Sequence, residues 1–261
     1  VPFTHGATLR LADVDAWVQS DQPVVDIPAG KTGDAETAIA QHIASRIPHG
    51  ATIQLGIGNL PDAVLQALHS HRDLGVHSGT IGDRVVDLVE AGVITNAHKS
   101  IDTGITVTGL LMGTARTRRW AHQNRALRMA GTDYTRQLRV LAQIDHLVAI
   151  NAAIEVDLTG QINAEVAAGK YVGAVGGAMD LAVGAKKVFI TTDHVTKKGE
   201  PKIVAELSYP ATGLKCVDRI YTDLCVIDVT PEGLKLIEKV EGLSFEELQT
   251  MTGAKLIDAT A

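Results

Sequence analysis

The sequence has only two cysteines, no long apolar run and no concentration of basic residues, and each shortage excludes a class of protein. Cys216 and Cys225 cannot build a disulfide framework, and no Cys/His cluster has zinc spacing, so we expect reduced thiols, no metal site and a cytoplasmic protein. No run approaches the roughly 20 apolar residues that span a bilayer, and the segment VPFTHGATLR lacks a signal-peptide pattern, so we expect no membrane partner. The formal net charge of -6, from 24 basic and 30 acidic residues mixed along the chain, argues against nucleic acid as a partner.

Strand and helix patterns alternate along most of the chain. Residues 1–33 are rich in turn formers and have no clear period, so we expect an N-terminal arm or linker, followed by one domain over residues 34–261. The apolar patterns predict a helix at 35–47 and strands at 51–55, 75–78, 105–111, 126–129, 146–150, 154–158 and 187–191. This alternation predicts an α/β fold with a mainly parallel sheet flanked by helices.

The C-terminal part has a different pattern. Residues 224–229 and 234–240 have strand composition and flank the turn sequence Thr230-Pro231-Glu232-Gly233, which predicts an antiparallel hairpin. Ser244 and Glu247 have capping-box spacing, so a last short helix is expected there, ending at Gly253.

The first candidate binding site is a glycine turn after the strand at 51–55. Gly56, Gly58 and Asn59 precede a helix that starts near Pro61. Glycines allow a ligand to approach the backbone, and the free N–H groups of a first helical turn attract anions, so a phosphate or an oxyanion would fit. The alternative is an ordinary tight turn.

A second glycine-rich stretch offers a similar arrangement. Gly173, Gly176 and Gly177 precede an expected helix at 180–185. Their backbone amides could line a thioester or hold a carbonyl oxygen as charge develops on it. A flexible turn before a helix is the alternative here.

The third candidate is the strand end at 75–78, with a turn expected at 79–82. Ligands of open α/β sheets collect at the carboxyl ends of strands, which makes His77 and Asp83 candidates for chemistry. Adjacent strand residues face opposite ways, so His77 and Ser78 do not form a simple catalytic pair. A half-buried strand-end histidine and a helix N-cap are the alternatives for His77 and Asp83.

Five arginines form a local basic patch that could face the phosphates of a nucleotide-like cofactor. A solvated face or a salt-bridged surface is the favoured alternative. The patch consists of Arg116, Arg118, Arg119, Arg125 and Arg128.

Long segments of the chain resemble one enzyme superfamily. Over residues 25–173, the segments IQLGIGNLPDAV, DLGVHSGTIGDRVVDLVEAGVITNAHK and INAAIEVDLTGQINAE resemble the C-terminal half of acetyl-CoA hydrolases and 4-hydroxybutyrate CoA-transferases. Over residues 176–257, GGAMDLAVGAKKV, PKIVAELSYPATGLKCVDRIYTDL and VIDVTPEGL resemble the β subunit of 3-oxoacid CoA-transferases. Both groups are class I CoA-transferases, so the sequence resembles a chimera of two homologous halves.

The resemblance implies transfer or hydrolysis of short-chain acyl-CoA, with CoA as co-substrate and no tightly bound cofactor. In the family a glutamate attacks the acyl-CoA in a ping-pong cycle, and the matching position here is Gly79. By the same resemblance Gly176 and Gly177 contact the oxyanion or thioester, and the turn at 56–59 borders the CoA pocket. Asn151 and Asn163 match family asparagines. A small carboxylic acid, a homologous partner half or α subunit and a homo- or hetero-oligomer are expected.

The glycine at the nucleophile position leaves several alternatives open. The chain could be a non-catalytic acyl-CoA binding or regulatory subunit; water held by His77 or Asp83 could hydrolyse the thioester; or Glu90, Glu155 or Glu165 could replace the missing carboxylate. A sugar-phosphate isomerase of the same broad superfold is a weaker option.

Overall fold

The computed structural model describes residues 1–56, 58–167, 169–171, 180 and 183–260. The helices are η1 (Leu11–Asp13), α1 (Asp34–Ala44), α2 (Asn59–Ala67), η2 (Leu68–Ser70), α3 (Asp83–Glu90), α4 (Ala115–Ala121), α5 (Thr132–Thr135), α6 (Leu138–Leu141) and α8 (Phe245–Thr250). The first strands are β1 (Thr52–Leu55), β2 (Gly75–Ile81), β3 (Thr106–Leu111), β4 (Leu127–Met129), β5 (Leu147–Ala152), β6 (Glu155–Asp157), β7 (Ile162–Asn163) and β8 (Val166–Ala167). The later strands are β9 (Lys170–Tyr171), β10 (Lys187–Thr191), β11 (Ile203–Val204), β12 (Arg219–Tyr221), β13 (Cys225–Thr230), β14 (Gly233–Lys239) and β15 (Leu256–Asp258).

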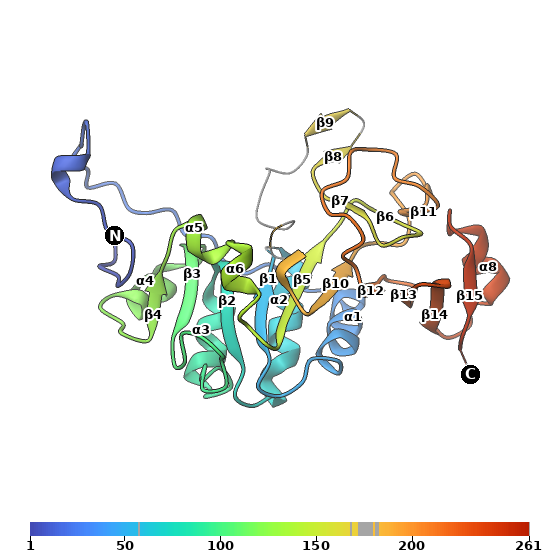
Figure 1. The fold of residues 1–261 in the computed structure, drawn as a ribbon, viewed down its shortest axis with the longest axis horizontal. Helices are drawn as coiled ribbons and strands as arrows, with labels where there is room; N and C mark the ends of the chain where they lie inside the picture. The colour runs from blue at the N-terminus through green and yellow to red at the C-terminus, as the bar shows by residue number, and fades with distance from the viewer. Residues whose placement is uncertain (57, 168, 172–179, 181–182, 261) are drawn as a thin grey trace.

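A ten-stranded sheet forms the centre of the molecule, in the order β15-β14-β13-β12-β10-β5-β1-β2-β3-β4 (Figure 1). All neighbouring pairs in it are parallel except β12 with β13 and β13 with β14. The predicted mainly parallel α/β sheet and its antiparallel C-terminal hairpin are therefore confirmed. Two smaller sheets, β11-β6-β7 and β8-β9, stand beside the main one.

The helices pack against the sheet because each presents an apolar face to it. α1, α2, α3 and α4 follow one another in contact, and Ile43 of α1, Val64 of α2 and Ile53 of β1 are fully buried between helices and sheet. Burial of one such aliphatic side chain contributes about 1.5–3 kcal/mol. α5 contacts β2 and β3. Figure 1 shows α5 and α6 near the upper ends of these two strands.

Two local predictions around β2 are wrong. The strand does not turn at 79–82 but continues to Ile81, because Thr80 and Ile81 pair with Leu110 and Leu111 of β3. Asp83 is the first residue of α3 rather than its N-cap, and the cap position is held by Gly82. The capping box of Ser244 and Glu247 is present as expected, although α8 already ends at Thr250.

The N-terminal arm touches the domain at its two ends. Near its start it pairs with the edge strand β4, where the N–H of Ala7 donates to the carbonyl of Met129 at 2.7 Å. Residues 8–26 are exposed, and the arm returns at residues 27–30, where the N–H of Gly30 donates to Asp62 at 3.0 Å. Within the described residues, no helix is both long and apolar enough to cross a bilayer.

Candidate active site

A cavity of about 440 Å³ lies at the carboxyl ends of β1 and β2. It brings together the turn after β1, the second half of β2, the start of α3 and the returning arm. Its lining includes four of the site residues expected from sequence, which are Gly56, Gly58, Asn59 and Asp83. A second hollow of about 310 Å³ extends toward the ends of β5 and β10, and Gly58 and Asn59 line both.

The turn into α2 shapes the first cavity. Gly58 has φ +123, a conformation that side-chain-bearing residues rarely adopt, and it is the N-cap of α2. The helix therefore starts abruptly, and its first free N–H groups lie beside the cavity. The arm packs closely against this turn, since a β-carbon added at Gly30 would stand only 1.8 Å from the side-chain oxygen of Asn59.

The electrostatics of this cavity suit an uncharged group. Asp62 and Asp83 line it, and no lysine, arginine or histidine is among its described lining residues. Burial raises the pKa of Asp62, opposed by the N–H of Gly30. The carboxylates of Asp62 and Asp83 disfavour an anion such as phosphate, and apolar side chains such as those of Leu55 and Leu65 form part of the remaining wall.

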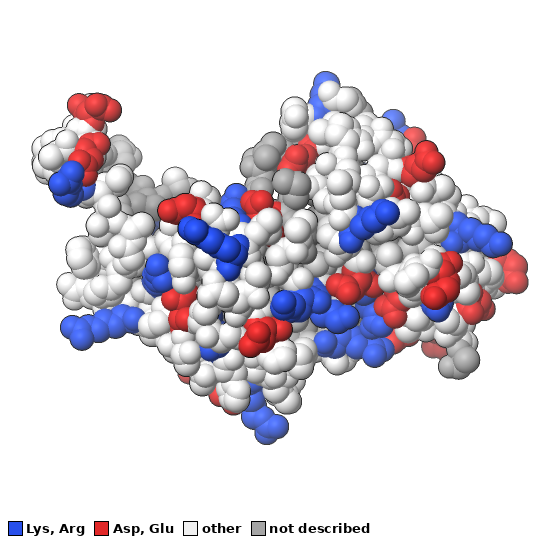
Figure 2. Space-filling view, viewed as in Figure 1, with Lys and Arg blue, Asp and Glu red and all other residues white. Residues whose placement is uncertain are grey.

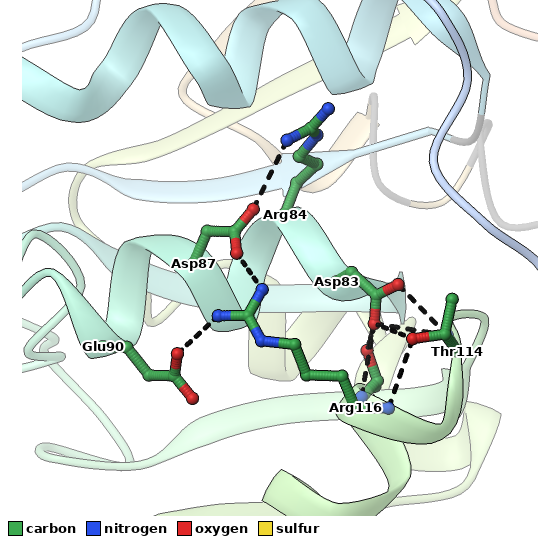
Figure 3. A network of polar contacts seen from close by, with 7 residues as sticks. Asp83, Arg84, Asp87, Glu90, Thr114 and Arg116 are labelled. Carbon is green, nitrogen blue, oxygen red and sulfur yellow. Dashed lines mark hydrogen bonds and ion pairs between the residues drawn. The ribbon is translucent and has the colours of Figure 1, made fainter.

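Asp83 holds the neighbouring helix α4 in place. Its carboxylate accepts hydrogen bonds from the backbone N–H and hydroxyl groups of Thr114 (Figure 3) and of Thr117. Burial alone would raise the pKa of Asp83, but these donors outweigh it and hold the pKa below its ordinary value. A carboxylate saturated in this way is a weak base.

Three of the five arginines in the basic patch are salt-bridged and the other two, Arg119 and Arg125, are exposed, which agrees with the favoured alternative. Arg116 pairs with both Asp87 and Glu90 (Figure 3). Arg118 pairs with Asp26 of the arm. Arg128 pairs with Asp102 at 3.0 Å and also lies over the ring of Tyr134. Figure 2 shows basic and acidic side chains interspersed on the face that it draws.

Position 79 faces away from the cavity, toward α5 and the residue that follows it. A β-carbon built on Gly79 would lie 3.7 Å from Nη2 and 3.8 Å from Nε of Arg136, with no other described atom within 4 Å. Both distances are ordinary van der Waals contacts, so the backbone admits a side chain at this position. The Nε atom of Arg136 is buried and has no hydrogen-bond partner.

His77 lies on the same face of β2 as Gly79 and is fully buried. Burial, helped by the nearby Lys99 ammonium, lowers the pKa of His77 from 6.5 to about 4. Its Nε2 lies 3.2 Å from the carbonyl of Thr135, so the neutral ring carries its proton on Nε2. The lone pair on Nδ1 is buried without a partner.

Comparison with known proteins identifies the family. A profile of acetyl-CoA hydrolase/transferase C-terminal domains matches residues 113–233. A 3-oxoadipate CoA-transferase subunit of Acinetobacter baylyi is 49% identical over 228 residues, which cover 85% of this chain and 94% of that protein. The chain belongs to the class I CoA-transferases. The 4-hydroxybutyrate coenzyme A transferase of Clostridium kluyveri is 36% identical over 213 residues, which cover 79% of this chain and 50% of that protein.

Two solved structures have the same fold as this chain. RipA from Yersinia pestis has 29% sequence identity and a TM-score of 0.78, covering 95% of this chain and 56% of its own. The 4-hydroxybutyrate CoA-transferase of Porphyromonas gingivalis has 28% identity and a TM-score of 0.73, covering 96% of this chain and 59% of its own. The chain thus spans little more than half of these structures, but nearly all of the Acinetobacter protein.

The two asparagines expected from the resemblance lie in different places. Asn151 is buried below the glycine turn, with its side-chain oxygen 3.5 Å from where a β-carbon of Gly56 would stand. Asn163 shapes a turn instead, accepting from the N–H groups of Glu165 and Val166, and it does not line the cavity. Gly173, Gly176 and Gly177 lie outside the described residues.

The three glutamates considered as replacements for the missing carboxylate do not line the cavity either. Glu90 is ion-paired with Arg116. Glu155 is buried in β6 and accepts from the N–H of Ser208 at 2.9 Å. Glu165 lies in the turn shaped by Asn163.

Sequence reasoning missed Arg136 and Gly109, which border position 79. The register of β2 and β3 places Gly109 opposite Gly79, and Arg136 follows directly after α5. No motif marks either residue, because only the pairing of strands and the packing of α5 bring them together.

Proposed function

We propose that this chain is the β-type half of a CoA-transferase that moves CoA between short-chain acyl-CoA thioesters and small carboxylic acids in the cytoplasm. The observation that carries the proposal is the 49% identity to a 3-oxoadipate CoA-transferase subunit, over 94% of that protein's length. Because this relative is named as one subunit of its enzyme, that enzyme has at least one other subunit. We therefore propose that the active unit of this chain includes a homologous partner half or α subunit.

The geometry of the site supports an acyl-CoA ligand. A volume of about 440 Å³ lies within the range of small-molecule sites. The cavity lies at the carboxyl ends of parallel strands, beside the N-terminus of α2. Its apolar walls and lack of described cations suit the uncharged acyl and pantetheine parts, which leaves the nucleotide end of CoA to other surfaces.

Gly79 favours a second candidate, a non-catalytic acyl-CoA binding or regulatory subunit, because glycine cannot supply a nucleophile. Hydrolysis by water held on Asp83 has less support, since Thr114 and Thr117 already saturate that carboxylate. Recruitment of Glu90 or Glu155 has less support too, because both carboxylates already have partners.

CoA transfer from acetyl-CoA, propionyl-CoA or succinyl-CoA to added carboxylates tests the proposal. The assay uses the full chain in the assembly in which it is purified from its host, with Gly79→Glu and Gly79→Ala as variants. Carboxylate-dependent transfer by the native chain is expected. Transfer by Gly79→Glu alone means that the native chain is a binder, and CoA release that needs no carboxylate means a hydrolase. The Gly79→Ala variant controls for any effect of a side chain as such.

A further inference from the structure

Residues 8–26 of the arm form an exposed apolar loop, the arm loop, which Figure 1 shows standing away from the sheet at the end that holds β4. Its most open apolar side chains have exposed fractions between 65% and 88%, and these are Leu9, Leu11, Trp17, Val18 and Val25. Ten of the eighteen exposed large apolar side chains in the described part of the chain lie within residues 1–27, about a tenth of its length. Single exposed apolar residues are ordinary on a protein surface, but such a concentration marks an interaction site.

The arm loop is anchored at both ends, so it differs from a free tail. Before it, the N–H of Ala7 donates to the carbonyl of Met129 in the edge strand β4. At its other end, Asp26 pairs with Arg118 of α4. Both anchors hold the loop beside the same edge of the sheet. An anchored loop loses less conformational freedom on binding than a free tail does, which favours it as a binding surface.

The course of the chain after the arm loop favours the homologous partner half as the partner that covers it. Residues 27–30 follow the loop directly and line the cavity of about 440 Å³ at the ends of β1 and β2. A partner that completes an acyl-CoA site must border that cavity. Such a partner therefore lies next to the point where the arm loop leaves the cavity wall.

The 4-hydroxybutyrate CoA-transferase of Porphyromonas gingivalis favours the same partner. Its alignment covers 96% of this chain, so about 10 of the 261 residues lie outside it. The arm loop has 19 residues, so part of it lies inside the alignment. The same alignment covers 59% of the other chain, which leaves 41% of that chain without a counterpart here. The counterpart of the arm loop thus belongs to a protein with a further region against which it can pack.

We propose that the arm loop is the surface that binds the homologous partner half, with Trp17 and Val18 buried against an apolar face of that partner. The proposal rests on the proposed function, which supplies the partner half. Docking of the arm loop also fixes residues 27–30, because the two segments are continuous. The partner half thus holds one wall of the acyl-CoA cavity in place.

Photo-crosslinking tests the contact without any assay of activity. The full chain, with p-benzoylphenylalanine in place of Trp17, is purified from its host in its assembly and irradiated, and mass spectrometry identifies the linked peptides. We expect links to a homologous half. Links only to a second copy of this chain, or no links, overturn the proposal. Leu214 is the matched control position, because it is 65% exposed, as Trp17 is, and lies between β11 and β12, away from the arm in Figure 1.

Removal of the apolar side chains tests how much they contribute to assembly. The double variant Trp17→Ser with Val18→Ser should raise the concentration at which the assembly dissociates by roughly tenfold or more, because buried aromatic anchors dominate binding at interfaces. Sedimentation velocity over a dilution series measures this concentration. Leu214→Ser should leave it unchanged. Both side chains of the double variant are exposed in the chain itself, so its urea midpoint should equal that of the native chain. Equal dissociation in the native assembly and the double variant overturns the proposal.

The outcomes separate this proposal from the proposed function. An assembly that transfers CoA but gives no link from position 17 to a homologous half keeps the transferase function and overturns the docking of the arm loop. An assembly that is linked through position 17 to a homologous half, but transfers CoA from none of the acyl-CoA thioesters, keeps the docking and overturns the transferase function.

Discussion

Gln54 and Asn151 hold each other's amides in a reciprocal pair beneath the glycine turn. The amide nitrogen of Gln54 donates to the oxygen of Asn151 at 3.2 Å, and the nitrogen of Asn151 donates back at 3.0 Å. Both side chains are buried, on the adjacent parallel strands β1 and β5. The pair ties together the ends of two strands just where Gly56 leaves the sheet.

Replacing one member of this pair should destabilise the fold. Asn151→Leu leaves the donor and the acceptor of Gln54 unpaired in the core, which costs about 1–3 kcal/mol. Urea unfolding at neutral pH measures the loss. The double variant Gln54→Met with Asn151→Leu removes both partners and should recover most of it. The pairing would be contradicted if the double variant lost as much free energy of unfolding as the single variants Asn151→Leu and Gln54→Met lose together.

Asp83 should prove to be an anchor of α4. In Asp83→Ala, the N–H groups of Thr114 and Thr117 lose a charged acceptor, and we expect a loss of about 1–3 kcal/mol in the free energy of unfolding. Amide exchange at these two residues should accelerate more than exchange in β1. Asp15→Ala, in the exposed arm, is the control and should change neither quantity. Unchanged exchange at Thr114 and Thr117 would refute the anchoring role.

The strands were the most predictable part of the fold. The run at residues 187–191 is apolar and β-branched between charged and polar neighbours, and β10 has those bounds. The prediction of a turn at 79–82 was wrong because the structure there depends on a distant partner strand. A glycine signals local freedom, but hydrogen bonds from β3 hold the backbone of β2 extended there, and the partner strand is not part of the local sequence.

The part of the site that lies at the ends of strands could be predicted from the sequence. Gly56 and Asp83 both come after strands that lie side by side in the sheet, so their meeting at one cavity follows from parallel pairing. Arg136 could not be found in this way. It reaches position 79 through the packing of α5 on β2 and β3, and no periodicity in the sequence encodes that contact.

Gly30 should control how the arm covers the cavity. The space beside it is taken by the side chain of Asn59, so Gly30→Val must displace that side chain, residues 27–30 or the turn before α2. We expect faster amide exchange at residue 30, whose N–H donates to Asp62 in the native chain, with little change in the urea midpoint. Lys31→Ala, at an exposed neighbouring position, is the control. Unchanged exchange at residue 30 of the variant would show that the arm tolerates a side chain there.

His77 should make the fold sensitive to acid. The unfolded chain binds a proton at His77 near pH 6.5, whereas burial delays this in the folded chain to a pKa of about 4. Between these values the unfolded state holds more protons, so stability falls as the pH is lowered from 6.5 toward 4. At 1.36 kcal/mol per pKa unit, the loss from this residue is roughly 3 kcal/mol at most.

The variant His77→Gln isolates this contribution. Glutamine keeps a side-chain N–H for the carbonyl of Thr135 but does not titrate. The free energy of unfolding, measured by urea at several pH values, should therefore fall less steeply between pH 6.5 and 4 in the variant than in the native chain. His194, whose pKa burial also lowers, is present in both proteins and cancels in the comparison. Parallel pH profiles would mean that the folded chain protonates His77 as readily as the unfolded one, and that the ring is less buried than its contacts indicate.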